Sequence, residues 1–170
     1  HLYAELYGLD YIFVTNDSSG DFLIANNVLI KYLGTQIDVF IPSEVTAVGG
    51  NAFLNCDFVK TITFQSEIEA IGAYAFAECT ALETISDLNN LNTMGAYAFF
   101  NCSKLNELSL LGSYTNIPSS IFEECESLTS LTLNQSYERI GIRAFKNCAS
   151  LTDFNIPSSV TEIKDSAFEG

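Results

Sequence analysis

The sequence predicts a repeat solenoid, in which short coils of chain stack on one another. The 170 residues contain five cysteines, and each lies 23 residues after the one before it. A phenylalanine stands three residues before each cysteine, and apolar residues stand three and six residues after it. These rows stay in register without an insertion, so each 23-residue unit is expected to form one coil of the same shape.

The aligned rows predict the core. The cysteines are Cys56, Cys79, Cys102, Cys125 and Cys148, and the phenylalanines are Phe53, Phe76, Phe99, Phe122, Phe145 and, continuing the row, Phe168. We expect the six phenylalanines to form one continuous buried row. The fourth unit departs from the pattern, because Ile117-Pro118 replaces an apolar residue followed by glycine and Ile121 replaces alanine. A locally bulged turn is expected there, without a break.

Each unit also contains one predicted strand. Residues 128–133 read Leu-Thr-Ser-Leu-Thr-Leu, and their apolar residues alternate with polar ones as in a half-buried strand. Stacked units place such strands side by side in parallel, about 4.8 Å apart. The Gly-x-x-Ala-Phe-x-x-Cys segment then turns the chain back, and we expect short helical or 3₁₀ turns there. The predicted class is a leucine-rich right-handed superhelix with a parallel sheet on its concave side.

Two stretches carry a family resemblance. Residues 156–170 read Ile-Pro-Ser-Ser-Val-Thr-Glu-Ile-Lys-Asp-Ser-Ala-Phe-Glu-Gly, and residues 41–49 follow the same pattern. They resemble the BspA-like leucine-rich repeat family, and the resemblance covers residues 21–170. It implies a strand-turn-strand opening unit over 21–42 and 23-residue repeats over 43–170, truncated at the C-terminus. Members similar to this chain are cell-surface or secreted proteins, mostly of gut and oral bacteria and some protozoa, that are linked to adhesion.

Residues 1–20 are interpreted as a flanking segment outside the repeats. Spaced leucines at Leu2, Leu6 and Leu9 favour a short amphipathic helix, and residues 10–14 are strand-like. Such a segment resembles the one that commonly follows a BspA-like array. With no starting Met and no signal peptide in view, we expect the chain to begin inside a longer protein.

Composition excludes several functions. Twenty-one Asp and Glu against seven Lys and Arg leave a formal net charge of −14, so a basic surface for nucleic acid or anionic lipid is absent. No apolar run reaches the length of a membrane span. The single histidine is His1, so histidine-based catalysis has nothing to work with. The sequence therefore predicts a protein that is not an enzyme and has no cofactor.

Three other motifs have structural interpretations. The cysteines lie in single file without a Cys-x-x-Cys pair, which argues against zinc, and parallel neighbours hold their Cβ atoms farther apart than a disulfide prefers. We expect free, buried thiols. Residues 17–21 (Asp-Ser-Ser-Gly-Asp) lack the spacing of a calcium loop and are interpreted as a turn. Three Asn-x-Ser matches are background in an Asn- and Ser-rich chain.

The candidate contact surface is the outward row of the predicted strands, which we call the ribbon. We expect it to be flat and continuous and to bind weakly or multivalently through short hydroxyl and acidic groups. A solvated sheet face without a ligand is the alternative. The ribbon consists of Asp38, Phe40, Thr61, Thr63, Thr84, Ser86, Glu107, Ser109, Ser130, Thr132, Asp153 and Asn155.

Two functions follow from this surface. The first is a non-catalytic surface or secreted module that binds a protein or glycoprotein on a host cell, in matrix or on a neighbouring cell. The second is a spacer that presents neighbouring enzymatic or glycan-binding domains. We also expect weak self-association through the open ends of the array, because exposed sheet edges invite pairing.

Overall fold

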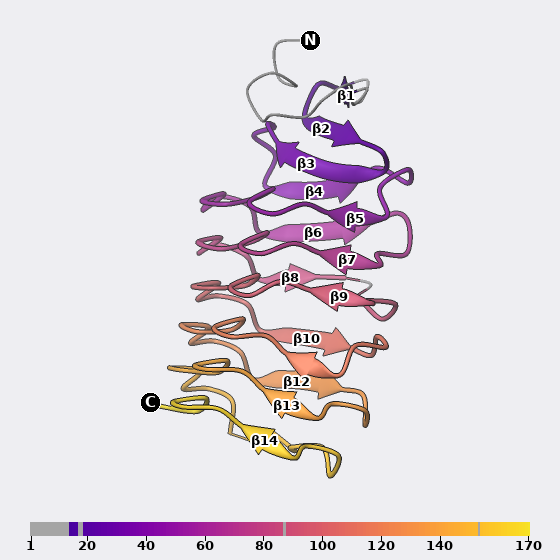
Figure 1. The fold of residues 1–170 in the computed structure, drawn as a ribbon. Helices are drawn as coiled ribbons and strands as arrows, with labels where there is room; N and C mark the ends of the chain where they lie inside the picture. The colour runs from indigo at the N-terminus through magenta and orange to yellow at the C-terminus, as the bar shows by residue number, and fades with distance from the viewer. Residues whose placement is uncertain (1–13, 17–18, 87, 153) are drawn as a thin grey trace.

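The structure is a computed structural model that describes residues 14–16, 19–86, 88–152 and 154–170. Its coils stack in a single column between the N-terminal strands and the last coil (Figure 1). The helix expected near the N-terminus and most of the strand expected at residues 10–14 lie outside the described residues.

An antiparallel sheet covers the first end of the column. Strand β1 (Val14–Asn16) pairs with β2 (Phe22–Ala25), and β2 pairs with β3 (Val28–Tyr32). Asn26 and Asn27 form the turn between β2 and β3 with φ of 50° and 63°. Asparagine tolerates this left-handed conformation, which a tight hairpin turn requires. Strand β3 then pairs in parallel with β5, so the hairpin joins directly onto the stacked coils.

The strands that carry the ribbon form the ribbon wall. They are parallel, and each residue pairs with the residue 23 positions later. Two sheets result, β4-β6-β8 and β10-β12. The strands are β4 (Asp38–Ile41), β6 (Thr61–Phe64), β8 (Thr84–Ile85), β10 (Glu107–Leu110) and β12 (Ser130–Leu133).

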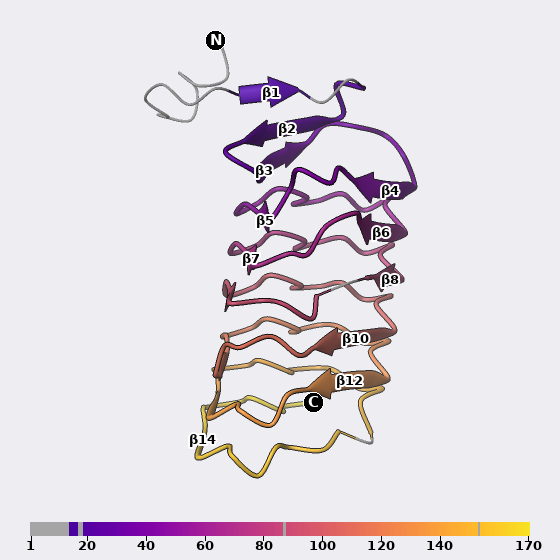
Figure 2. The ribbon, with the colours of Figure 1, turned by 90° about the vertical axis from the view of Figure 1, so that its right-hand side faces the viewer.

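A second wall of parallel strands lies on the opposite side of the coils (Figure 2). It continues from β3 through β5, β7 and β9, and a separate sheet joins β11, β13 and β14. The sequence predicted one strand for each unit, so this wall is an addition to the expected fold. Its strands are β5 (Ala47–Val48), β7 (Ala70–Ile71), β9 (Thr93–Met94), β11 (Asn116–Ile117), β13 (Arg139–Ile140) and β14 (Glu162–Ile163).

The expected helical or 3₁₀ turns are wrong, because the described residues contain no helix. The Ala-Phe-x-x-Cys segments form a third side of the column, which we call the turn wall. Along it, every second backbone N–H donates to a carbonyl of the next coil, and those between donate to a carbonyl of their own coil. Asn51, Phe53 and Asn55 donate to carbonyls of the next coil at 2.7–3.1 Å. The intervening residues donate three residues back within their own coil. This alternation requires positive φ at residues 51 and 55 (60° and 63°), which ends any helix after a single turn.

The left-handed positions recur in every coil of the turn wall. They lie two residues before and two residues after each phenylalanine, as at Tyr74 and Glu78 or Ser120 and Glu124. The fourth unit keeps them, and its N–H groups at Ser120 and Phe122 bond to the next coil in the same way. The bulge expected around Ile117–Ile121 is therefore wrong.

The phenylalanines stack along the column axis. From Phe53 to Phe145, the centroids of neighbouring rings lie 5.2–5.6 Å apart, and the planes of the rings are inclined to one another by 13–25°. These five side chains are almost completely buried, and Tyr32 of the hairpin extends the stack at 4.9 Å from Phe53. Phe168 stacks on Phe145 but is 40% exposed, so the expectation of six buried rings is wrong at the last coil. Each buried phenylalanine removes roughly 150–250 Å² of surface from water, so the stack supplies much of the core.

Candidate functional site

Most of the described ribbon residues point outward from alternate positions of the ribbon wall, while the residues between them are inward and mostly buried. The Ser86 hydroxyl differs, because it is buried and has no hydrogen-bond partner among the described residues. In β4 the exposures alternate, with Asp38 and Phe40 exposed and Val39 and Ile41 buried. Thr84, Glu107, Ser130, Thr132 and Asn155 are also exposed, whereas Thr61, Thr63, Ser86 and Ser109 are half-buried. Asp153 lies outside the described residues.

Strand register brings most of these side chains into short rows. Asp38, Thr61 and Thr84 are successive partners across β4, β6 and β8. The pairs Phe40–Thr63, Glu107–Ser130 and Ser109–Thr132 are likewise aligned. In the first row the Thr61 hydroxyl donates to the Asp38 carboxylate at 2.7 Å. The ribbon residues on β4, β6 and β8 and those on β10 and β12 therefore form two ordered sets of mostly polar side chains.

The ribbon is not continuous, which corrects the expectation of one flat surface. Within the described residues strand β8 ends at Ile85, and the next strand pair of this wall is β10 with β12, although the Asn106 N–H still bonds to the Glu83 carbonyl. In the repeat register, Asp87 stands where four other coils have the buried residues Ile41, Phe64, Leu110 and Leu133. Burying a carboxylate without a partner is costly, so this position cannot continue the apolar row.

In the third coil the residue that follows Asp87, Leu88, takes the buried place. Leu88 is buried, although its counterparts Gln65 and Leu111 are exposed. The inward position is therefore shifted by one residue, and in a strand a one-residue shift reverses the faces.

The ribbon also loses its regular pairing after β12. The Thr129 N–H bonds to the Asn106 carbonyl of the preceding coil, but the Thr152 N–H bonds locally to Ser150. Phe154 is only half-buried, and Ile156 is 45% exposed. Asn155 therefore lies beyond the ordered part of the ribbon.

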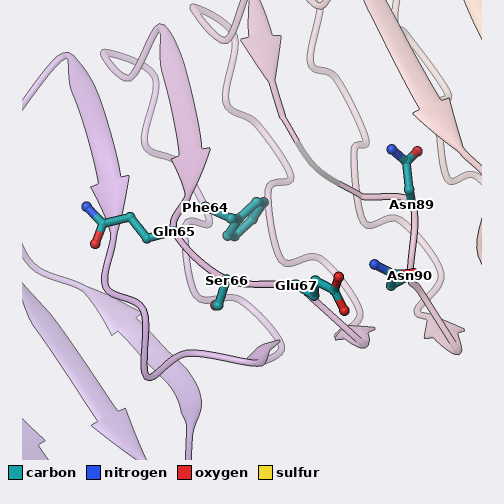
Figure 3. A pocket seen from close by; sticks show the side chains of 6 residues that line it. All are labelled: Phe64, Gln65, Ser66, Glu67, Asn89 and Asn90. Carbon is teal, nitrogen blue, oxygen red and sulfur yellow. The ribbon is translucent and has the colours of Figure 1, made fainter.

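A shallow open hollow of about 390 Å³ lies beside the interruption, where the chain leaves β6 (Figure 3). It is lined by Phe64, Gln65, Ser66, Glu67, Asn89 and Asn90. The periodicity of the sequence does not predict this hollow, because loop residues after a strand carry no periodic signal. Asp87 in an otherwise apolar row is the signal that could have indicated it.

The stretch of sequence that contains the hollow is acidic between Lys60 and Lys104, and Glu67 is the charged residue of the lining. Residues 61–103 contain five carboxylates, Glu67, Glu69, Glu78, Glu83 and Asp87, and no Lys or Arg. Of these, Glu83 pairs with Lys60 at 3.7 Å, and Glu78 accepts a hydrogen bond from Asn101 at 2.7 Å. This part of the array therefore attracts cations.

The cysteines have a structural role. The thiols of Cys79, Cys102, Cys125 and Cys148 each donate to the carbonyl of a phenylalanine in the preceding coil at 3.1–3.2 Å. All five cysteines are free, and burial raises the pKa of each thiol, for Cys148 to about 12. Protonated, buried thiols are poor nucleophiles and poor metal ligands.

Neither a metal site nor a membrane-spanning helix is found in the described part of the chain. It holds no group of three or more His, Cys, Asp or Glu side chains placed to bind a metal ion. It also has no helix long and apolar enough to cross a bilayer.

Stacked 23-residue coils with parallel strands and a buried apolar row define a leucine-rich repeat solenoid. The model of the BspA-type leucine-rich repeat region matches residues 46–170 in six copies. The chain therefore belongs to the BspA-type leucine-rich repeat family, as the sequence resemblance indicated. No curated protein matches the sequence.

Solved structures share the fold. One, described as a leucine-rich cell-surface protein from Faecalibacterium prausnitzii, is 27% identical with a TM-score of 0.77, and the match covers 94% of this chain and 52% of that one. A leucine-rich repeat protein from Eubacterium ventriosum is 24% identical with a TM-score of 0.71, and the match covers 91% of this chain and 51% of that one. A leucine-rich repeat protein from Bacteroides ovatus is 24% identical with a TM-score of 0.63, and the match covers 94% of this chain and 49% of that one. The chain thus spans about half the length of these structures.

Proposed function

We propose that the chain is a non-catalytic interaction module of a cell-surface or secreted protein and that its ribbon binds a protein or glycoprotein. The partner would lie on a host cell, in matrix or on a neighbouring cell. The relative from Faecalibacterium prausnitzii, described as a cell-surface protein, supports this location. Adhesion is the activity that such a surface would serve.

The observation that carries the proposal is the register of exposed side chains on the ribbon wall. Asp38, Thr61 and Thr84 repeat at the spacing of parallel strands, about 4.8 Å, so an extended partner would meet several coils at once. Each short hydroxyl contributes little, and the affinity would come from the number of contacts.

Charge indicates the kind of partner. The ribbon includes Asp38, Glu107 and Asp153 and no Lys or Arg, and the whole chain carries a formal net charge of −14. A basic or hydroxyl-rich partner is therefore favoured. Its attraction should weaken as salt rises, because exposed charges are screened beyond about 8 Å at physiological ionic strength.

The test is a triple substitution on the ribbon, Thr84→Arg, Glu107→Arg and Thr132→Arg, followed by measurement of binding to matrix proteins and to cells. All three side chains are exposed, so the fold should tolerate the change. The matched control is Thr93→Arg, Asn116→Arg and Glu138→Arg, which adds the same charge at exposed positions of the second wall and the loop before it. Loss of binding in the ribbon variant alone supports the proposal.

Glu78, Asn101 and Glu124 would be poor control positions. They lie on the turn wall at positive φ, and Asn101 and Asn147 donate to Glu78 and Glu124 at 2.7 and 2.8 Å. Substitutions there would change stability as well as charge.

A spacer is the second candidate function. It is favoured by hydrogen bonds that the ribbon groups already make within the array, such as Thr61 to Asp38 and Ser109 to Asn89 at 3.1 Å. Groups that are satisfied in this way gain less from a ligand. If the parent protein binds no matrix protein or cell, the spacer becomes the better account.

A further inference from the structure

We infer that the free edge of β4 binds an extended peptide segment of a basic partner, which joins the ribbon wall as one additional strand. Strand β4 is the outermost strand of the sheet β4-β6-β8, and in Figure 2 it is the uppermost strand on its side of the column. The inference rests on the proposed function and deepens it, because it states which conformation the partner adopts where it meets the ribbon.

The hairpin of β2 and β3 closes two walls of the first coil and leaves the ribbon wall open. On the second wall β3 pairs with β5, and on the turn wall the Tyr32 N–H donates to the Ala52 carbonyl at 2.9 Å. The linker between β3 and β4 bonds elsewhere. Its Leu33 N–H donates to the Asp21 carbonyl at 2.7 Å, and its Gln36 N–H donates to the Tyr32 hydroxyl at 2.9 Å. Within the described residues, no strand therefore pairs with the outer edge of β4.

The backbone of β4 presents unpaired groups along this edge. The Ile37 carbonyl accepts a bond from the Thr61 N–H, so alternate residues from Ile37 onward direct their backbone groups toward β6. The residues between them direct theirs to the other side, so the N–H and C=O groups of Asp38 and Phe40 face the free edge. No hydrogen bond to these groups is found within the described residues. The corresponding groups of β6 are paired with β4.

The pattern of these groups favours a peptide over a sugar. Donors and acceptors alternate along the edge at the spacing of a strand, which is the pattern that the backbone of an extended peptide complements. A sugar lacks this regular series of amide groups. An added strand would also extend the aligned outward rows of the ribbon, Asp38–Thr61–Thr84 and Phe40–Thr63, by one position each.

Apolar side chains around the edge favour the same mode of binding. Phe40 is 60% exposed, which makes it the most exposed large apolar side chain among the described residues. Ile37 and Leu33, in the linker that precedes β4, are exposed as well. Soluble proteins usually cover or charge an unpaired edge, and aromatic or β-branched residues of neighbouring strands stabilise each other as cross-strand pairs. An apolar side chain of the added strand would pack beside Phe40.

Charge selects a basic segment over a second copy of the chain. Each copy carries a formal net charge of −14, so two copies repel one another, whereas a basic segment is attracted. Asp38 is exposed on the outward face of the edge strand, beside the position that an outward residue of the added strand would take. A lysine, arginine or hydroxyl residue is therefore favoured there.

The direct test is an NMR titration of the full chain with acetyl-Lys-Val-Lys-Val-Tyr-Val-Lys-amide. Its lysines and tyrosine can lie on one face of a strand, beside Asp38 and Phe40, with its valines on the other face. We expect chemical-shift changes and slower hydrogen exchange at the amides of Asp38 and Phe40. This measurement uses the parent protein and needs no variant that could misfold.

The control peptide has the same sequence with N-methyl groups on its fourth and fifth residues. Alternate residues of a strand bond to a given neighbour, so methylation of two consecutive residues removes a bond whichever way the peptide runs. Its charge is unchanged. Because the lost hydrogen bonds are the basis of the contact, it should bind about tenfold more weakly.

Two substitutions of one residue then locate the contact. Phe40→Thr and Phe40→Pro both remove the ring, but only proline also removes the N–H that faces the free edge. An unpaired edge position tolerates proline, and threonine is the residue of the next coil at Thr63. The proline variant should bind the peptide about tenfold more weakly than the threonine variant.

Several results would overturn the assignment. These are equal binding of the methylated and unmethylated peptides, shifts that leave Asp38 and Phe40 unchanged, and equal binding by the two Phe40 variants. Equal shifts of the same amides with a neutral methyl glycoside would also overturn it. A dimer that slows exchange at Asp38 and Phe40 without peptide would assign the edge to a second copy instead.

The outcome is separable from that of the proposed function. The ribbon variant (Thr84→Arg, Glu107→Arg and Thr132→Arg) leaves β4 unchanged, so it should still bind the peptide. A ribbon variant that binds the peptide but no matrix protein or cell supports both claims. A parent protein that binds only the peptide supports the edge alone. If Phe40→Pro binds matrix proteins and cells as the parent does, the edge assignment falls and the proposed function stands.

Discussion

The turn wall and the ribbon wall are built from the same 23-residue repeat, yet only the turn wall is regular over every coil. Its positive-φ positions recur through the last unit, and its N–H groups bond to the next coil throughout. The ribbon wall separates into β4-β6-β8 and β10-β12. Both walls face the same core, so the difference lies in the residues that each wall presents inward.

On the turn wall the inward residues are nearly alike from coil to coil, with Ile121 in place of alanine in the fourth unit. Phenylalanine stacks on phenylalanine, and the small Ala and Cys side chains let neighbouring coils approach. On the ribbon wall the corresponding residues vary in size, and in one coil Asp87 replaces the apolar residue. The turn wall therefore holds the column together, while the inward residues of the ribbon wall are free to vary between coils.

The largest expected effect comes from breaking the turn wall at its centre. Phe99→Ala removes a completely buried ring that stacks on two neighbours, and it should cost about 3–5 kcal/mol of unfolding free energy. Phe168→Ala removes a ring that is 40% exposed and should cost clearly less. Denaturant titration measures both, and equal midpoint shifts would contradict the stacked core.

The thiols provide a pH-dependent test of the same wall. Burial raises the pKa of Cys102 and Cys125 well above the ordinary value, so the folded chain keeps protons that the unfolded chain releases above about pH 8.5. The contribution of these thiols to the free energy of unfolding should therefore be fully present below that pH. Above it, the free energy of unfolding should fall by about 1.4 kcal/mol per pH unit for each such thiol. Thermal melts between pH 8 and 10 measure the slope.

Cys102→Ala is the control for this slope, because it removes one titrating thiol and should flatten the pH dependence. A thiol reagent at pH 8 should meanwhile find few reactive groups in the native protein and five after unfolding, since all the cysteines are free. A reducing agent should hardly change the melting temperature. A large loss of stability on reduction would show that the cysteines are cross-linked.

The smallest expected effect comes from repairing the ribbon wall. Asp87→Leu with Leu88→Asn restores the inward register of the neighbouring coils, in which Phe64 and Leu110 are buried. We expect β8 to lengthen and pair with β10, with a gain of about 1 kcal/mol from added burial and hydrogen bonds. Slower hydrogen exchange at the amides of β10 would show the new pairing. Unchanged exchange would mean that another feature interrupts the wall.

The sequence was sufficient to determine the repeat itself. The 23-residue spacing of cysteine and phenylalanine predicted the number and register of the coils, and five of the six phenylalanines are buried as expected. The alternation in residues such as Ser130–Leu133 likewise predicted the strands of the ribbon wall. Periodic positions report which side chains face inward, and burial of apolar side chains is the dominant favourable term in folding.

Only the tertiary structure decided how the backbone satisfies its hydrogen bonds. The second wall and the turns in place of helices both depend on partners in a coil about 23 residues away. Asparagine at residues 51 and 55 is compatible with positive φ, but nothing in Tyr74 or Tyr97 by itself predicts that conformation. These residues adopt it because the stacked coils impose the same hydrogen-bond ladder on whichever side chain occupies the position.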